Sequence, residues 1–85
     1  MTDKVFTLRV LTAEGTVFEG PVSAAFLPGA MGAFEVLPGH APIVSTLDAG
    51  QLRWRADGKE SGIAVRGGTV MLKNETLTVC VQVAS

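Results

Sequence analysis

The sequence predicts an all-β fold, a flattened sandwich or barrel of about ten short strands. Apolar and polar residues alternate at a period of two, as in Phe6, Leu8 and Val10, which is the spacing of a half-buried strand. Turn signals built from glycine, proline, asparagine and aspartate recur about every eight to twelve residues. No segment holds an apolar repeat of helical period, so no helix is expected.

The breaks between the expected strands fall at residues that favour turns. Gly20-Pro21 stops the second strand, Asp57-Gly58 is a strong hairpin signal, and Asn74-Glu75 makes the last turn. Arg66-Gly67-Gly68 is also expected to be a turn, because paired glycines suit positive φ. In chain order the expected strands are residues 5–11, 16–19, 22–27, 33–36, 43–47, 51–56, 59–65, 69–73 and 77–83.

Residues 28–50 break this regular spacing. They hold three of the four prolines and four of the ten glycines, with apolar side chains such as Met31 and Phe34 among them. Two interpretations stay open. The segment is either an irregular connection whose apolar residues fold inward, or a stiff loop whose apolar residues meet a partner.

The composition excludes several classes of function. The net charge is −1 and the seven basic residues are scattered, so no nucleic-acid partner is expected. His40 and Cys80 are the only residues of their types, which leaves no ligand cluster for a metal and no catalytic or cofactor-binding set to assign. Cys80 is expected to be a small core or sheet residue. The longest uncharged stretch is 15 residues and contains two prolines, so direct insertion into a bilayer is not expected.

A long ordered motif runs through residues 32–52, which read GAFEVLPGHAPIVSTLDAGQL. It resembles the central signature of the ATP synthase epsilon subunit family (delta in some organisms), roughly G-x-F-G-V-L-P-G-H-A-P-L-x-T-x-L-x-x-G-x-L. Residues 8–15, 64–68 and 77–79 are similar to further pieces of the family pattern, in the same order. The resemblance therefore covers essentially the whole chain.

The resemblance implies a fold and a domain content. Members of this family have a ten-stranded β-sandwich followed by a two-helix hairpin. We expect residues 1–85 to form the epsilon-type β-sandwich domain, with no C-terminal helical domain after it. In the family the hairpin restrains ATP hydrolysis and in some members binds ATP, so we expect neither property here and no cofactor.

The resemblance also implies a role. The chain resembles a non-catalytic rotor subunit in the central stalk of a proton- or sodium-translocating F-type ATP synthase, one that couples the c-ring of the membrane sector to the gamma subunit. It implies a peripheral position on the cytoplasmic face of the inner (plasma) membrane, held by other subunits. Carried over by motif, the gamma-subunit positions are Thr12, His40, Ala41, Pro42 and Ser45, and the c-ring positions are Met31, Gly32, Ala33, Phe34 and Glu35.

Three positions depart from the family pattern. Ala33 stands where the family often has an acid, and Glu35 stands where it usually has glycine. A carboxylate displaced by two residues stays on the same face of a strand, so Glu35 is a candidate substitute. Arg66 replaces the serine of the late S-G-G turn, so the hydrogen bonds of that serine are not carried over.

Two other functions are weighed beside the rotor subunit. A stand-alone ligand-binding β-sandwich, such as a carbohydrate module, needs exposed aromatic residues, and Trp54 is the only strong candidate. Its alternation with Arg53 and Arg55 predicts that it packs in the core instead. A small enzyme is disfavoured by the poor inventory of catalytic residues.

Overall fold

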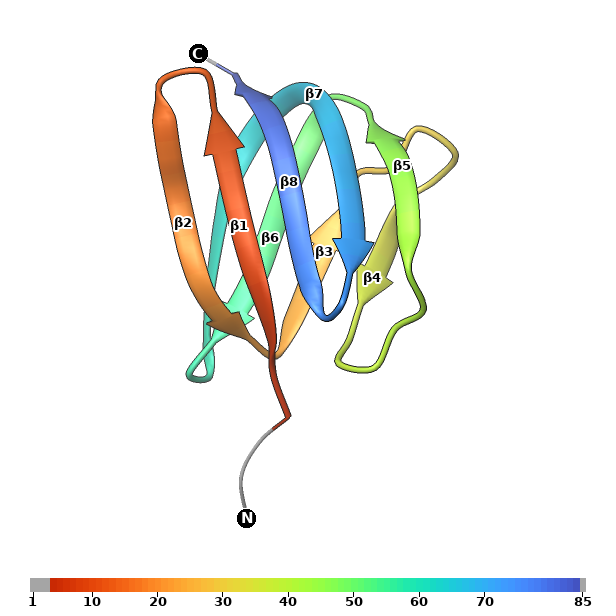
Figure 1. Cartoon of the computed structure of the whole chain (residues 1–85). Coiled ribbons are helices and arrows are strands. Elements are labelled where there is room, and N and C mark those ends of the chain that lie inside the picture. Colours follow the sequence, from red (N-terminus) through yellow and green to blue (C-terminus); the bar gives the residue numbers. More distant parts are fainter. Residues whose placement is uncertain (1–3, 85) are drawn as a thin grey trace.

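A computed structural model describes residues 4–84; residues 1–3 and 85, which the expected domain includes, lie outside the described residues. Over the described part the chain is all-β and forms a compact sandwich without a helix, which confirms the predicted fold class (Figure 1). It has eight strands rather than about ten. They are β1 (Phe6–Thr12), β2 (Gly15–Val22), β3 (Ala24–Leu27), β4 (Phe34–Val36), β5 (Ile43–Leu47), β6 (Gly50–Ala56), β7 (Lys59–Lys73) and β8 (Thr76–Val83).

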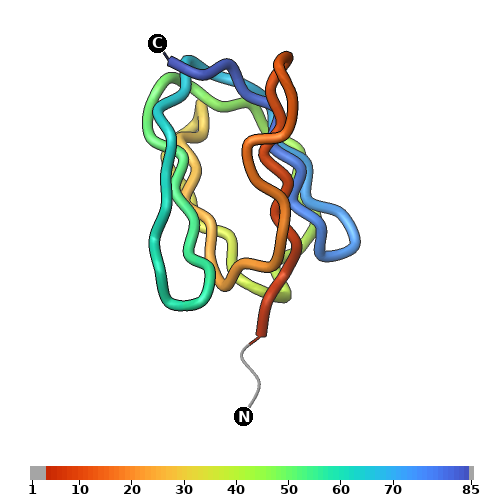
Figure 2. Tube along the Cα trace, turned by 90° about the vertical axis from the view of Figure 1, so that its left-hand side faces the viewer, coloured from red at the N-terminus to blue at the C-terminus, as the bar shows by residue number. Residues whose placement is uncertain are grey.

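The strands form two layers, which Figure 2 shows edge-on. The strand order is β2-β1-β8-β7-β6-β3-β4, and β5 pairs separately with β7. We call β2, β1, β8, β5 and the second half of β7 the front layer. The back layer is the first half of β7 with β6, β3 and β4. The β1–β8 pair is parallel and the other strand pairs are antiparallel.

Strand β7 joins the two layers. Its residues 59–65 pair with β6, and its residues 68–72 pair with both β5 and β8. The expected turn at Arg66-Gly67-Gly68 is wrong, because the strand continues through these residues with a register shift between Val65 and Gly67. A Cβ at Gly68 would collide with the carbonyl oxygen of Cys80 on β8. This glycine therefore serves the close approach of two strands at a bend, and not a tight turn.

The core lies between the layers and follows the period-two pattern. Trp54 is only 5% exposed, which confirms that it packs inward. No polar or charged side chain of the described residues is buried. The buried cluster comprises Phe6, Leu8, Val10, Val22, Ala25, Leu27, Val36, Leu47, Leu52, Trp54, Val65, Val70, Leu72, Leu77, Val79 and Val81.

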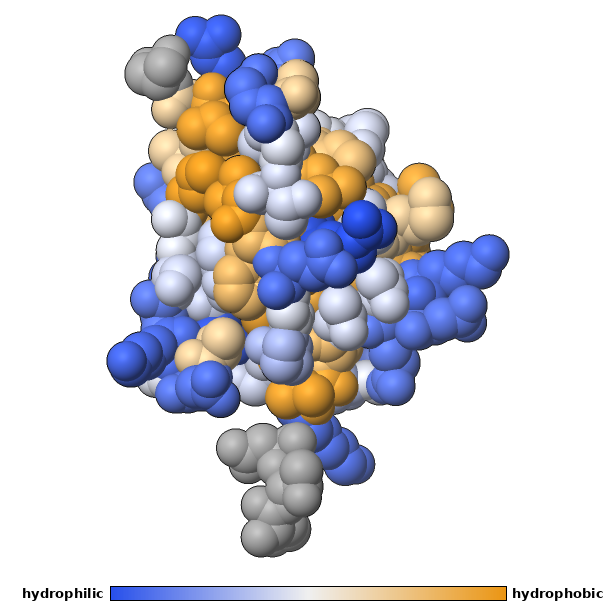
Figure 3. Space-filling view, turned by 60° about the vertical axis from the view of Figure 1, so that its left-hand side comes forward, coloured by the Kyte–Doolittle hydropathy of each residue, from blue (hydrophilic) through white to orange (hydrophobic). Residues whose placement is uncertain are grey.

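The surface differs from this core. Figure 3 brings the left-hand side of Figure 1 forward. On this side, hydrophilic side chains divide the apolar surface into patches. Within residues 4–84, no helix is long and apolar enough to cross a membrane.

Candidate docking surfaces

The five candidate gamma positions all belong to the front layer or to the loop that leads into it. Thr12 ends β1, Ser45 lies in β5, and His40, Ala41 and Pro42 lie in the connection from β4 to β5. In Figure 1 Thr12 is at the end of β1 that carries its arrowhead, while this connection lies near the opposite end of the layer. The structure therefore places the five residues on one side of the sandwich but does not gather them into one site.

The bend at His40 is defined by backbone contacts. Gly39 has a positive φ of 86°, and the His40 amide donates a hydrogen bond to the Leu37 carbonyl at 3.1 Å. The Nδ1 atom of His40 lies 2.6 Å from the carbonyl oxygen of Ala41. The imidazole is exposed. The ring is held against the backbone of its own loop, and no side chain of residues 4–84 is its hydrogen-bond partner.

Thr12 and Ser45 are also bound locally. The Thr12 hydroxyl donates to the Gly15 carbonyl at 3.1 Å and accepts from the Glu14 amide at 3.2 Å, which closes the turn between β1 and β2. The Ser45 hydroxyl donates to the Thr46 carbonyl at 3.2 Å. Ser45 pairs in register with the buried Val70, so it lies on the half-buried side of β5 and not on the outer face.

The outer face of the front layer is formed by residues that the sequence reasoning did not select. Cross-strand register aligns Val44 on β5 with Met71 on β7 and Thr78 on β8. The next row aligns Thr46, Thr69, Cys80 and Leu11. None of these residues is charged. The first charge in the row of Val44 is Arg9 on β1, which pairs with Thr78 and whose Nε atom lies 3.7 Å from Oε1 of Glu19 on the edge strand β2.

Two side chains of this face are notably exposed. Val44 is 79% exposed and Met71 is 50% exposed. They form one wall of a shallow hollow of about 450 Å³ that Pro42, Ile43, Leu72, Lys73 and Asn74 complete. The sequence of residues 43–47 already indicated this exposed apolar surface, because the residues on both faces of the strand are apolar or small. A strand buried on one face only would carry more polar residues on the other.

The candidate c-ring positions lie on the back layer and at its corner. Met31 is 98% exposed at the tip of the loop between β3 and β4, which the Gly32 amide closes by donating to the Gly29 carbonyl at 3.0 Å. Ala33, Phe34 and Glu35 follow and line one groove together. Within the 28–50 segment, Val36 folds into the core while Met31 projects outward, so the inward interpretation applies to some of its apolar residues and a partner contact at the others stays a prediction.

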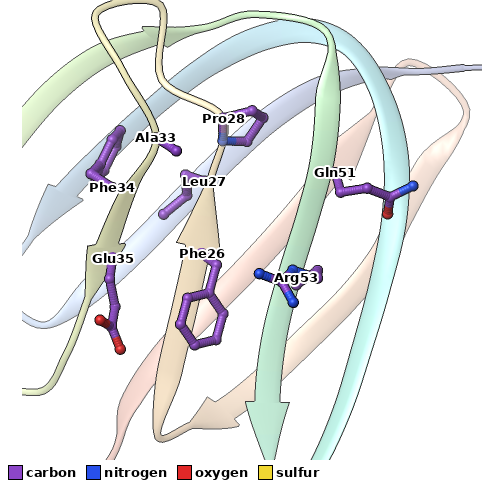
Figure 4. A pocket seen from close by; sticks show the side chains of 8 residues that line it. All are labelled: Phe26, Leu27, Pro28, Ala33, Phe34, Glu35, Gln51 and Arg53. Atoms are coloured by element: carbon purple, nitrogen blue, oxygen red, sulfur yellow. The ribbon is translucent and has the colours of Figure 1, made fainter.

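The groove has an aromatic floor and charged walls (Figure 4). Its volume is about 400 Å³, and its lining residues are Phe26, Leu27, Pro28, Ala33, Phe34, Glu35, Gln51 and Arg53. The guanidinium carbons of Arg53 and Arg55 lie 5.1 and 5.7 Å from the centroid of the Phe26 ring. Arg53 also forms an ion pair of 2.9 Å with Glu60.

Phe26 and the two arginines were missed as candidate site residues. The alternation in the sequence placed Phe26 on the same face as Val22 and Ala24. In the structure the strand is interrupted at Ser23, since β2 ends at Val22 and β3 begins at Ala24, and both of these residues are buried. After that break Ala25 and Leu27 face the core, so Phe26 faces outward. Arg53 and Arg55 were visible as the polar positions beside Trp54, although their shared partner was not.

Among residues 4–84, no group of three or more His, Cys, Asp or Glu side chains could hold a metal ion. Cys80 is a sheet residue as expected, but it is exposed on the outer face of the front layer.

Comparisons with known proteins agree on one family. The model of the ATP synthase delta/epsilon chain β-sandwich domain matches residues 5–85. The chain is 44% identical over 78 residues to the ATP synthase epsilon chain of Synechococcus elongatus, covering 92% of this chain and 57% of that one. It is 37% identical to the epsilon chain of Desulfitobacterium hafniense, covering 93% and 60%.

Solved structures share the fold. A chain of the Euglena gracilis mitochondrial ATP synthase OSCP/F1/c-ring structure aligns with a TM-score of 0.83 at 20% identity, over 95% of this chain and 52% of that one. A chain of the Tetrahymena thermophila mitochondrial ATP synthase central stalk and c-ring aligns with a TM-score of 0.76 at 17% identity, over 95% and 66%.

This chain spans 57% of the length of the Synechococcus elongatus relative and 60% of the Desulfitobacterium hafniense one. Within that span the family model accounts for nearly all of its residues, and the motif of residues 32–52 forms β4, β5, their connection and the start of β6. The chain belongs to the family of the ATP synthase delta/epsilon chain β-sandwich domain.

Proposed function

We propose that this chain is a non-catalytic coupling subunit in the central stalk of an F-type ATP synthase. Its front layer binds the gamma subunit, and the loop of Met31, Gly32, Ala33, Phe34 and Glu35 contacts the c-ring. The chain turns with both and helps to transmit torque from the ion-driven ring to the catalytic head. It is peripheral, held by other subunits at the cytoplasmic face of the inner (plasma) membrane.

One observation supports this proposal above the others. The outer face of the front layer offers two in-register rows of uncharged side chains, from β5 across β7 and β8 toward β1. Val44 and Met71, which pair in register on this face, both remain exposed. Exposed apolar surface marks either a protein interaction site or a ligand groove, and a shallow surface favours the protein partner because small-molecule sites are concave.

The sandwich suits a mechanical role. A closely packed interior deforms little, so a force applied at one layer reaches the other without loss of shape. Strand β7 takes part in both layers as one continuous segment, which ties them covalently as well as by packing. Family membership supports the partners, and the two aligned chains come from ATP synthase structures described as OSCP/F1/c-ring and as central stalk and c-ring.

The other two functions receive less support. The carbohydrate-module alternative depended on Trp54, and that side chain is buried. The enzyme alternative needs convergent ionisable groups, while the hydrogen bond of the His40 ring is to the Ala41 carbonyl of its own loop.

The proposal is tested by capture of the gamma subunit from the same organism. We expect the immobilised full chain to retain purified gamma and to show no turnover alone. His40→Ala should weaken capture only about two- to fivefold, because it removes one contact to the Ala41 carbonyl and no chemical step. Failure to retain gamma, or activity of the isolated chain that disappears in His40→Ala, would contradict the proposal.

A further inference from the structure

Strand β2 has one free edge at the side of the sandwich (Figure 1). The strand covers Gly15–Val22 and pairs with β1, and no other strand of residues 4–84 pairs with it. A free edge presents unpaired N–H and C=O groups, to which a strand of another chain can add. A second copy of this chain carries the same edge, and two identical edges can meet about a twofold axis.

The hydrogen bonds of β1 show which backbone groups of β2 face the free edge. The Thr7 amide donates to the Glu75 carbonyl at 2.9 Å, so the polar backbone groups of Thr7 point toward β8 and away from β2. Thr7 lies opposite Pro21, and the backbone groups of Pro21 therefore point outward, away from β1. Because directions alternate along a strand, the backbone groups of Glu19 and Ser23 point outward as well.

These outward positions offer few hydrogen-bond donors to a second strand. The Ser23 amide is already used, since it donates to the Arg55 carbonyl on β6 at 2.8 Å. Pro21 has no N–H group to donate. Among residues 19–23, only Glu19 therefore has an outward amide that is open to another chain. Proline and charged side chains on an edge are two devices that block strand addition.

A bulge interrupts the other end of the same edge. The register with β1 shifts between Val10 and Leu11, so that Phe18 and Thr16 have partners on β1 while Val17 between them has none. The extra residue breaks the two-residue spacing of outward groups and increases the local twist. A regular strand that follows the edge from residue 21 therefore loses its register at this point.

Glu19 is itself unfavourable between two copies. Its side chain is 54% exposed, and its Oε1 atom lies 3.7 Å from Nε of Arg9. One antiparallel register through residues 19–23 places Glu19 opposite Glu19 of the other copy, which sets like charges against each other. The other registers place Glu19 opposite Pro21, which lacks the N–H, or opposite Ser23, whose N–H is already bonded.

We propose that Pro21, Glu19 and the bulge at Val17 close the free edge of β2 to a second copy of this chain, and so prevent edge-to-edge self-association. Each of the three acts on a different requirement of strand pairing, namely the donors, the charges and the register. The inference goes beyond the proposed function, because it concerns contacts between copies of this chain and not contacts with gamma or the c-ring.

Sedimentation velocity of the full chain tests the inference. The double variant Pro21→Val/Glu19→Thr restores an outward N–H and removes the charge. We expect its dissociation constant for self-association to fall at least about tenfold below that of the wild type. The control Thr69→Val adds an exposed β-branched side chain to β7 where that strand is paired with both β5 and β8, and should leave the constant within about twofold.

Moving the proline by two residues locates the contact. In Pro21→Val/Glu19→Pro the outward amide is removed at residue 19 instead of residue 21. The Glu19 amide points away from β1, so the ladder between β1 and β2 keeps its hydrogen bonds. We expect this variant to return to within about twofold of the wild-type constant. Urea titration checks that each variant is folded, and Pro21→Thr alone carries the test where the double variant is not.

Three results would overturn the inference. The first is a dissociation constant in the folded Pro21→Val/Glu19→Thr protein, or in its substitute Pro21→Thr, equal to that of the wild type. The second is association that persists in Pro21→Val/Glu19→Pro, because it would not run through the edge of β2. The third is an equal gain in Thr69→Val, which would assign the association to added apolar surface.

Discussion

The rings of Phe18 and Trp54 pack across the two layers with centroids 5.1 Å apart and planes inclined at 39°. Phe18 belongs to β2, the outermost strand of the front layer, and Trp54 belongs to β6 in the back layer. Among the described residues, strand β2 pairs with β1 alone, so its other edge has no backbone partner from residues 4–84. The aromatic pair closes the sandwich at this edge by packing.

Shortening Phe18 should loosen this edge. We expect Phe18→Leu to lower the free energy of unfolding by about 1–2 kcal/mol, through lost packing and the lost aromatic contact. Urea titration followed by the fluorescence of Trp54, the only tryptophan, measures both the stability and the local environment. The adjacent Val17 is exposed, so Val17→Ala should change stability by less than about 0.5 kcal/mol. Equal losses in both variants would contradict the role of the pair.

Part of this fold could be predicted from local pattern. Strict alternation placed Trp54 inward and Arg53 and Arg55 outward, because side chains on a strand point to opposite faces. The turns at Asp57-Gly58 and Asn74-Glu75 also lie where expected. The alternation could not show that β7 crosses between layers, since a bend with a bulge and a tight turn both favour glycine.

The site was less accessible to sequence reasoning. Its candidate residues came from a motif, which names positions but not the faces on which they lie. Ser45 proved to lie on the half-buried side of β5, while Val44 projects from the outer face. The row of Glu35, Phe26 and Arg53 depends on the register of three strands, β4, β3 and β6. Of these, β3 and β6 are separated in the sequence by β4 and β5. Register is a tertiary property, set by packing and loop lengths together.

Gly68 offers a test of the bend in β7. A Cβ at this position would meet the Cys80 carbonyl and crowd the Val81 backbone, so the strands must separate to admit it. We expect Gly68→Ala to lower the free energy of unfolding by about 2–4 kcal/mol in a denaturant titration. Arg66→Ala alters an exposed side chain in the same bend and should cost less than about 0.5 kcal/mol. A Gly68→Ala protein as stable as the wild type would refute the close approach.

Gly39 tests whether the bend at residues 37–42 shapes the gamma contact. Its φ of 86° is strained for a β-branched residue, although open space surrounds the position of a Cβ. We expect Gly39→Val to cost about 1–2 kcal/mol of stability and to reduce gamma affinity by more than about tenfold. Gly39→Asn is the control, because asparagine tolerates positive φ and should retain most of the affinity. Unchanged gamma affinity in Gly39→Val would count against an interface at His40, Ala41 and Pro42.

Val44 tests the outer face of the front layer directly. The side chain is 79% exposed, so a lysine there is solvated in the free chain and Val44→Lys should shift the unfolding midpoint little. In the complex the same ammonium would be buried against an uncharged partner surface, which is unfavourable without a counter-charge. We expect gamma affinity, measured by biolayer interferometry, to fall by at least about tenfold. Val17→Lys places an identical charge on an exposed valine of β2, at the opposite edge of the layer, and should leave binding within about twofold. If both lysines weaken gamma equally, the effect is one of net charge, and the front face does not dock through Val44.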